Sequence, residues 1–284
     1  MSRVAVVGAG TMGNGIAHVF AQAGWETTLI DVSRDALDKA LKTIEANLER
    51  QAKKGAGSGE RGGGAAVLAR IRTSTALDGA ASAEFFVEAA TERPEVKFDL
   101  FRQLDRAAPA DAILATNTSS IPITGIAAQT KRPAQVIGMH FMNPVPVMQL
   151  VEVIRGLETS DQTVAKTLAI AKGLGKIPVL VHDSPGFVSN RVLMPMINEA
   201  IFCLMEGVAT PEAIDTVMKV GLNHPLGPLA LADLIGLDVC LAILEVLHRD
   251  LGDDKYRPCP LLRTMVAAGR LGRKTGRGFH VYGG

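Results

Sequence analysis

The sequence predicts an α/β fold in which a doubly wound, mostly parallel sheet carries a helical hairpin excursion and is followed by an all-α C-terminal domain. Short β-branched runs alternate with helix-like segments through the first two thirds of the chain, and a glycine-rich turn follows the first run. After the Pro-Gly stretch Asp183–Phe187 the pattern is helical only. The 284 residues suffice for two domains, which we place at 1–184 and 185–284.

Charge and composition exclude several classes of protein. Thirty Lys and Arg against 29 Asp and Glu leave a net charge of +1, so no general field attracts nucleic acid or a membrane surface. Aromatic residues make up 4% of the chain, too few for the stacking platforms that hold single-stranded nucleic acid. The most apolar stretch, Leu226–Leu244, contains Asp233 and Asp238, each of which costs roughly 2.5–3.5 kcal/mol in a bilayer centre. We therefore expect a buried helix there, and no membrane partner.

The cysteines and histidines predict a reducing compartment and no metal. Cys203, Cys240 and Cys259 are odd in number and lack the CxxC spacing, so they cannot form a full disulfide framework. The six histidines are scattered, without HxxxH or a Cys/His cluster. We expect a cytoplasmic protein.

The first element is a strand, and the turn after it predicts a nucleotide site. The run Arg3–Val7 is β-branched, and the motif GAGTMG leads into a helix-like stretch, Asn14–Ala23. In a Rossmann-type βαβ unit the first glycine makes the turn, the second admits a pyrophosphate and the third lets helix and strand pack closely. The helix N-terminus faces the phosphates. We assign the cofactor diphosphate to this turn, namely to Gly8, Gly10, Thr11, Met12 and Gly13.

The second strand ends in an acid that predicts the cofactor. The run Thr27–Ile30 precedes Asp31, which lies 31 − 8 = 23 residues after Gly8. A carboxylate there accepts hydrogen bonds from the ribose hydroxyls of NAD, whereas the 2′-phosphate of NADP would meet like charge. NAD is therefore preferred, although Arg34 leaves NADP(H) use open. The alternative is that the glycines serve only a sharp turn and that Asp31 only caps the helix from Arg34.

A helical hairpin follows, at about residues 35–72. Apolar residues recur at helical spacing from Ala36 to Leu48, and the polar face ends in Arg50, Lys53 and Lys54. Six glycines occupy the ten residues Gly55–Gly64, and a second helix-like stretch, 65–71, comes next. Such an excursion is longer than sheet closure requires, so we expect it to have a function of its own. The alternative is a solvated, charged helix end.

Later apolar runs continue the sheet, and polar residues stand at their ends. The runs are Phe85–Val87, Ala112–Ala115, Val136–Met139 and Val147–Ile154. Ligands of doubly wound sheets bind beyond the carboxyl ends of the strands. Glu92, the run Asn117–Ser120, and His140 with Asn143 stand at those ends, and they are candidate site residues.

The C-terminal domain is predicted to be entirely helical. The first, Val188–Met205, contains Pro195, which predicts a kink. Thr210–Pro211 reads as the N-cap and first residue of another helix that stops at Gly221. The stretch Leu229–Leu247 is apolar on most faces, which predicts burial against a partner subunit.

His140 and Glu152 are the catalytic candidates. An imidazole with an ordinary pKa near 6.5 suits proton transfer at neutral pH. A lone histidine is more often structural, which is the alternative here. Glu152 stands inside the apolar run 150–154, where a carboxylate is costly unless it is paired. A His–Glu pair would meet that need and would stabilise an imidazolium.

Several long motifs, in order along the chain, resemble one family. GAGTMG, NTSSIPIT, GMHFMNPVPVMQLVEVI, DSPGFVSNR and GRKTGRGF resemble the 3-hydroxyacyl-CoA dehydrogenases, most closely the bacterial 3-hydroxybutyryl-CoA dehydrogenase branch. The resemblance implies an oxidoreductase of fatty acid metabolism and a homodimer joined through the C-terminal domain. The implied reaction interconverts (3S)-3-hydroxyacyl-CoA and 3-ketoacyl-CoA, for example acetoacetyl-CoA, by hydride transfer with NAD(H).

The same resemblance assigns residue roles. It makes His140 the general base and Glu152 its partner, while Ser119 and Asn190 hydrogen-bond the oxygens of the substrate. It implies cofactor contacts at Glu92, Lys97, Ser119, Asn143 and Lys274, and a contact of Lys54 with the CoA phosphates. We add the neighbouring Lys53 as a candidate for the same contact. Asn47, seven residues before Lys54, stands where some members have a serine that accompanies the lysine.

Two other functions stay open from the sequence. A dehydrogenase of a free hydroxy acid or sugar acid would keep the fold but would not need the hairpin lysines. A non-catalytic nucleotide-binding or structural relative would keep the catalytic residues only as scaffold. No motif encodes the acyl chain length, because a methylene changes binding by only about 1–3 kcal/mol.

Overall fold

The computed structural model describes residues 2–53 and 63–283, and these residues form two compact units. The first unit is Met1–Asp183 and the second is Ser184–Gly284. This division lies one residue before the boundary that the Pro-Gly stretch predicts. None of the helices among these residues is long and apolar enough to cross a membrane.

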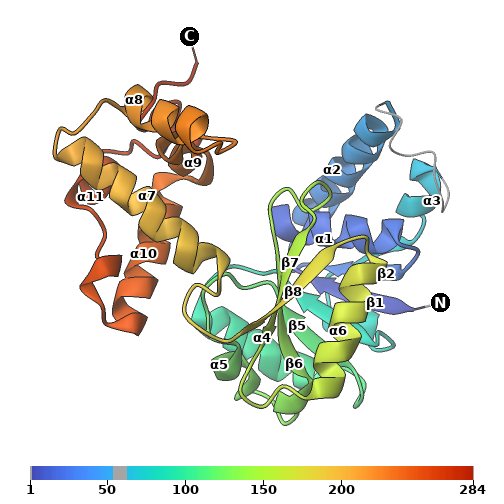
Figure 1. Cartoon of the computed structure of the whole chain (residues 1–284). Helices are drawn as coiled ribbons and strands as arrows, with labels where there is room; N and C mark the ends of the chain where they lie inside the picture. Colours follow the sequence, from blue (N-terminus) through green and yellow to red (C-terminus); the bar gives the residue numbers. More distant parts are fainter. Residues whose placement is uncertain (1, 54–62, 284) are drawn as a thin grey trace. The chain divides into compact units, whose positions relative to one another are not determined.

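The first unit is built on one sheet, to which the described residues contribute eight strands (Figure 1). Their spatial order is β3-β2-β1-β4-β5-β6-β7-β8. The strands are β1 (Arg3–Val7), β2 (Glu26–Ile30), β3 (Ile71–Ser74), β4 (Phe85–Glu88), β5 (Ile113–Thr116), β6 (Val136–Phe141), β7 (Leu150–Arg155) and β8 (Ile177–His182). Within the described part, β6 and β7 are antiparallel and the other neighbours are parallel. The predicted mostly parallel, doubly wound sheet is confirmed.

Helices cover both faces of this sheet. The main core lies between the strands and four helices on one face: α1 (Thr11–Gln22), α2 (Arg34–Lys53), α3 (Gly64–Leu68) and α6 (Asp161–Gly173). The opposite face is covered by α4 (Pro94–Ala107) and α5 (Ile123–Ala127). A side chain at Gly138 on β6 would lie 2.8 Å from Ile123 Cδ1, so α5 packs tightly on that face. Short 3₁₀ turns occur at Leu77–Ala80 and Pro133–Gln135.

The order of the strands shows at which end of the sheet a ligand would bind. From β1 the chain moves outward to β2 and β3, then returns to β4 on the other side of β1 and continues to β5 and β6. The turns after β1 and β4 touch, because Ala89 N–H donates to Val7 O at 2.7 Å. Since β7 is antiparallel to β6, its first residues lie at the end of the sheet where β1 to β6 have their carboxyl ends. Ligands of such sheets bind at this switch point.

The hairpin and the two edges of the sheet differ most from the prediction. The second hairpin helix ends at Leu68, and Ile71 begins the unpredicted strand β3. The strand β8 was also not predicted. Both strands lie at sheet edges, with one neighbour each, so their burial does not follow a clear alternation. The strand expected from Val147 starts at Leu150, because Val147 and Met148 N–H groups turn back to Pro144 O.

The second unit is helical. Its helices are α7 (Ser189–Met205), α8 (Pro211–Thr216), which continues as a π-helical turn (Val217–Gly221), α9 (Pro228–Ile235), α10 (Leu237–Leu251) and α11 (Pro260–Ala267), with 3₁₀ turns at Asp254–Tyr256 and Arg273–Thr275. Thr210 caps α8 by accepting from Ala213 N–H at 3.3 Å, as predicted, and Pro195 lies inside α7. The apolar stretch 229–247 is two helices, because Gly236 between them takes φ +105°.

Candidate active site

The turn after β1 has the shape of a diphosphate cradle. Gly8 has φ +104°, and a Cβ there would lie 2.6 Å from Ala89 O. A Cβ at Gly13 would lie 1.7 Å from Gly8 O, so helix α1 packs directly on the turn. At Gly10, by contrast, a Cβ would meet no described atom within 4 Å, and no described side chain caps α1 there. The turn is thus closed toward the protein and open at the helix N-terminus, which fits a bound diphosphate.

Asp31 is held rigidly beside this turn. Its Oδ2 accepts from Ala9 N–H at 2.8 Å, and its Oδ1 accepts from Ser33 N–H at 2.9 Å. The side chain at the start of α2 that accepts a helix N–H is Ser33, whose Oγ is 3.2 Å from Ala36 N. The alternative role of Asp31 as a cap for this helix is therefore wrong. Arg34 reaches Thr73 Oγ1 at 3.5 Å.

His140 and Glu152 are direct cross-strand partners. They pair in the register of β6 and β7, and His140 Nδ1 lies 2.9 Å from Glu152 Oε2. The side chains are 11% and 3% exposed. Because their neighbours Met139 and Val153 belong to the core under α1 and α6, the alternation of strands directs both side chains to the opposite face, toward α4 and α5. With an ionised carboxylate, which can only accept, Nδ1 would carry the proton and the lone pair of a neutral ring would reside on Nε2.

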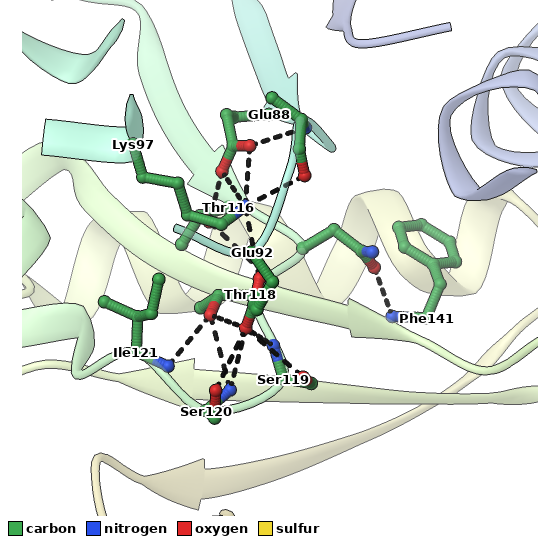
Figure 2. A network of polar contacts seen from close by, with 11 residues as sticks. Glu88, Glu92, Lys97, Thr116, Thr118, Ser119, Ser120, Ile121 and Phe141 are labelled. Atoms are coloured by element: carbon green, nitrogen blue, oxygen red, sulfur yellow. Dashed lines mark hydrogen bonds and ion pairs between the residues drawn. The ribbon is translucent and has the colours of Figure 1, made fainter. Parts of the chain in front are cut away.

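Glu92 organises the loop after β5, as Figure 2 shows. Within the described part, its Oε1 accepts from Thr118 Oγ1 at 2.6 Å, from Ser119 N–H at 2.8 Å and Oγ at 3.2 Å, and from Ser120 N–H at 3.1 Å and Oγ at 3.2 Å. Burial raises the pKa of Glu92, but the charge of Lys97 and these hydrogen bonds outweigh it, so the pKa lies below its ordinary value. Glu92 is therefore an anion at neutral pH, and it holds Ser119 in place.

Lys97 forms a buried ion pair. Its side chain is 1% exposed, and its Nζ lies 2.7 and 2.8 Å from the carboxylate oxygens of Glu88. The same Nζ lies 3.4 Å from Glu92 Oε2, and the cofactor contact that the resemblance implies for Lys97 stays a prediction. Glu88 was missed in the sequence, although an acid that closes the apolar strand FFVE was a signal that it has a partner.

Asn117 is a second residue whose partners could not be predicted from the sequence. Its backbone N–H donates to Glu88 O at 2.7 Å, and its side-chain Oδ1 accepts from Phe141 N–H at 2.9 Å. The side chain thus ties the loop after β5 to the end of β6, next to His140. Asn143 is exposed just beyond that strand.

The remaining predicted residues lie elsewhere. Lys53 is the exposed last residue of α2, while Lys54 and most of the glycine-rich tip lie outside the described residues. Asn190 is in the first turn of α7. Lys274 pairs with Asp238 at 2.5 and 2.7 Å, within the second unit. Their contacts with substrate or cofactor stay predictions.

Comparisons with known proteins show the family to which the chain belongs. The family model for the 3-hydroxyacyl-CoA dehydrogenase NAD binding domain matches residues 3–184, and the model for the C-terminal domain of the same family matches residues 186–282. A probable 3-hydroxybutyryl-CoA dehydrogenase of Bacillus subtilis is 56% identical over 282 residues, which are 99% of this chain and 98% of the relative. The 3-hydroxyadipyl-CoA dehydrogenase of Escherichia coli is 43% identical over 98% of this chain and 58% of the relative.

A solved structure is similar over both units. The crystal structure of (S)-3-hydroxybutyryl-CoA dehydrogenase from Ralstonia eutropha matches with a TM-score of 0.96 and 52% identity, and it covers 100% of each chain. The chain therefore belongs to the 3-hydroxyacyl-CoA dehydrogenases, a family of oxidoreductases whose NAD binding domain it carries at residues 3–184.

Proposed function

We propose that this protein interconverts (3S)-3-hydroxybutyryl-CoA and acetoacetyl-CoA with NAD(H). The observation that carries the proposal is the 2.9 Å contact between His140 and Glu152 at the sheet edge that also bears the diphosphate turn. The names of the relatives from Bacillus subtilis and Ralstonia eutropha support the four-carbon acyl group.

The chemistry assigned to the pair follows from its hydrogen bond. His140 Nε2 accepts the proton of the 3-hydroxyl group as C3 gives up a hydride, and Glu152 stabilises the imidazolium that results. Bound NAD supplies the hydride acceptor. In the reverse direction Nε2–H returns the proton to the ketone oxygen. Glu152 also fixes the ring orientation, because its carboxylate requires the proton on Nδ1.

Other residues hold the two ligands in this proposal. Ser119 and Asn190 hydrogen-bond the oxygens of the substrate, and Lys53 with Lys54 pair with the CoA phosphates. The Gly8–Gly13 turn takes the cofactor diphosphate, with further cofactor contacts from Glu92, Lys97, Ser119, Asn143 and Lys274. The carboxylate of Asp31, held by two backbone N–H groups, favours NAD over NADP.

The proposal extends to a homodimer in the cytoplasm. The second unit exposes apolar side chains that a partner subunit would cover, with Val192 68%, Val217 63%, Val220 80% and Leu222 62% exposed. Cys203, Cys240 and Cys259 are free thiols, as a reducing compartment would keep them.

Absorbance at the NADH band tests the function. We expect NADH to be consumed rapidly with acetoacetyl-CoA, more slowly with NADPH in its place, and hardly at all with free acetoacetate. No turnover of the thioester, or equal turnover of acetoacetate, would refute the CoA substrate and point to a free hydroxy acid.

A further inference from the structure

We propose that Lys97 is a positioning residue: its buried ammonium, fixed by Glu88, holds Glu92 in the one place from which Glu92 can order the loop that carries Ser119. The inference rests on the proposed function only in that Ser119 is there assigned to the substrate. It is separate from the cofactor contact that is proposed for Lys97.

The buried pair fixes the position of the ammonium. Each carboxylate oxygen of Glu88 accepts two hydrogen bonds. Oε1 accepts from Ala90 N–H at 2.6 Å and from Lys97, while Oε2 accepts from Thr116 Oγ1 at 2.7 Å and from Lys97. Glu88 is 0% exposed. These contacts come from β4, β5 and the turn after β4, so the carboxylate and its lysine are anchored to the sheet itself.

The Lys97 ammonium also faces Glu92. Lys97 Nζ lies 3.4 Å from Ala90 O and 3.4 Å from Glu92 Oε2. The two oxygens of Glu92 thus have different tasks: Oε2 faces the lysine, and Oε1 receives the hydrogen bonds of the loop. Figure 2 shows this chain of contacts from Glu88 through Lys97 and Glu92 to Ser119 and Ser120.

The charges explain why the lysine is needed. Glu92 is 37% exposed, so without a fixed cation its carboxylate can turn to water or take up a proton. Either change removes the acceptor of the Ser119 and Ser120 N–H groups. Loss of the ammonium would also leave the carboxylates of Glu88 and Glu92, which lie 2.7 and 3.4 Å from Lys97 Nζ, without the cation that they share. A second link, from Thr116 Oγ1 to Thr118 N–H at 3.3 Å, joins Glu88 to the same loop but bears no charge.

The decisive variant removes the buried pair as a unit. Lys97→Met alone would leave Glu88 charged and buried, which endangers folding, whereas Glu88→Gln with Lys97→Met leaves no buried charge unpaired. In this double variant we expect the amides of Ser119 and Ser120 to exchange with D₂O at least tenfold faster. We expect kcat with acetoacetyl-CoA and NADH to fall at least tenfold. The matched control is Arg106→Met, which removes an exposed cation from the same helix.

Two readouts separate positioning from a merely structural role. Wild-type exchange of the two amides, or a wild-type kcat in a folded double variant, would overturn the proposal. If the double variant does not fold, Glu92→Gln tests the same link from the exposed side, and unchanged amide exchange there would overturn it equally. The exchange experiment uses the protein without ligands, so its result stands even if acetoacetyl-CoA is not a substrate.

Discussion

His18 on α1 allows a quantitative prediction of how pH changes stability. Its side chain is 0% exposed, and neither ring nitrogen has a hydrogen-bond partner within the described residues. Burial, followed by the charge of Lys176, lowers the pKa of His18 from 6.5 to about 4. The folded protein therefore keeps this ring neutral at a pH at which the unfolded chain already binds a proton.

The sign and the size follow from these two values. Because the unfolded chain binds the proton first, the stabilising contribution is complete above pH 6.5 and is lost as the pH falls from 6.5 to about 4. The full loss corresponds to about 3 kcal/mol, and between pH 7.5 and pH 5 it amounts to about 2 kcal/mol. His18→Leu removes the titrating ring at nearly constant volume, so at pH 7.5 we expect its stability to lie within about 1.5 kcal/mol of wild type.

Urea unfolding followed by the fluorescence of Trp25 measures this difference. Trp25 is the single tryptophan, and its ring packs edge-on against Phe20 on α1 at 5.3 Å, so it reports on the first unit. Other groups also titrate between pH 7.5 and pH 5, and the variant shares them. His182→Gln, at an exposed position, is the control for the loss of a histidine. If wild type and His18→Leu lose the same stability over this range, the burial argument is refuted.

Three further variants test the site. His140→Gln should lower kcat by about 10²- to 10⁴-fold while NADH binding, measured by fluorescence titration, persists; a near-normal kcat would remove His140 from the role of base. Asp31→Asn should raise the ratio of NADPH to NADH turnover at least tenfold, since about 1.4 kcal/mol or more of like-charge repulsion is removed, and an unchanged ratio would contradict that role. Lys53→Glu should raise KM for acetoacetyl-CoA several-fold at low salt but leave KM for NADH unchanged, and equal KM values at low and high salt would count against a phosphate contact.

Local features of the sequence were enough for the nucleotide turn and for much of the sheet. The GAGTMG spacing and Asp31 are read within one βαβ unit, where a strand, a turn and a helix follow directly. The contact between His140 and Glu152 could only be suggested, because it depends on the register between two strands and on the reversal of β7. Burial of an acid indicates that it needs a partner, but it does not identify that partner.

The ion pair of Glu88 and Lys97 shows the same limit. Nothing in the sequence near Lys97 indicates that its side chain is 1% exposed. Glu88 and Lys97 are nine residues apart, and they meet because α4 folds back over the end of β4. The edge strands β3 and β8 were missed because an edge has one neighbour and therefore a weaker burial pattern.

The antiparallel pairing of β6 and β7 has a consequence for how the active site can change over time. The contact between His140 and Glu152 is held by the register of two strands, whereas Asn143 stands on the connection between them. The connection can therefore vary in sequence, and even in length, while the geometry of the His140–Glu152 contact is inherited unchanged. Relatives can diverge in that connection without rebuilding the contact, provided that the strand register is kept, because a slip by one residue would turn Glu152 to the other face of the sheet.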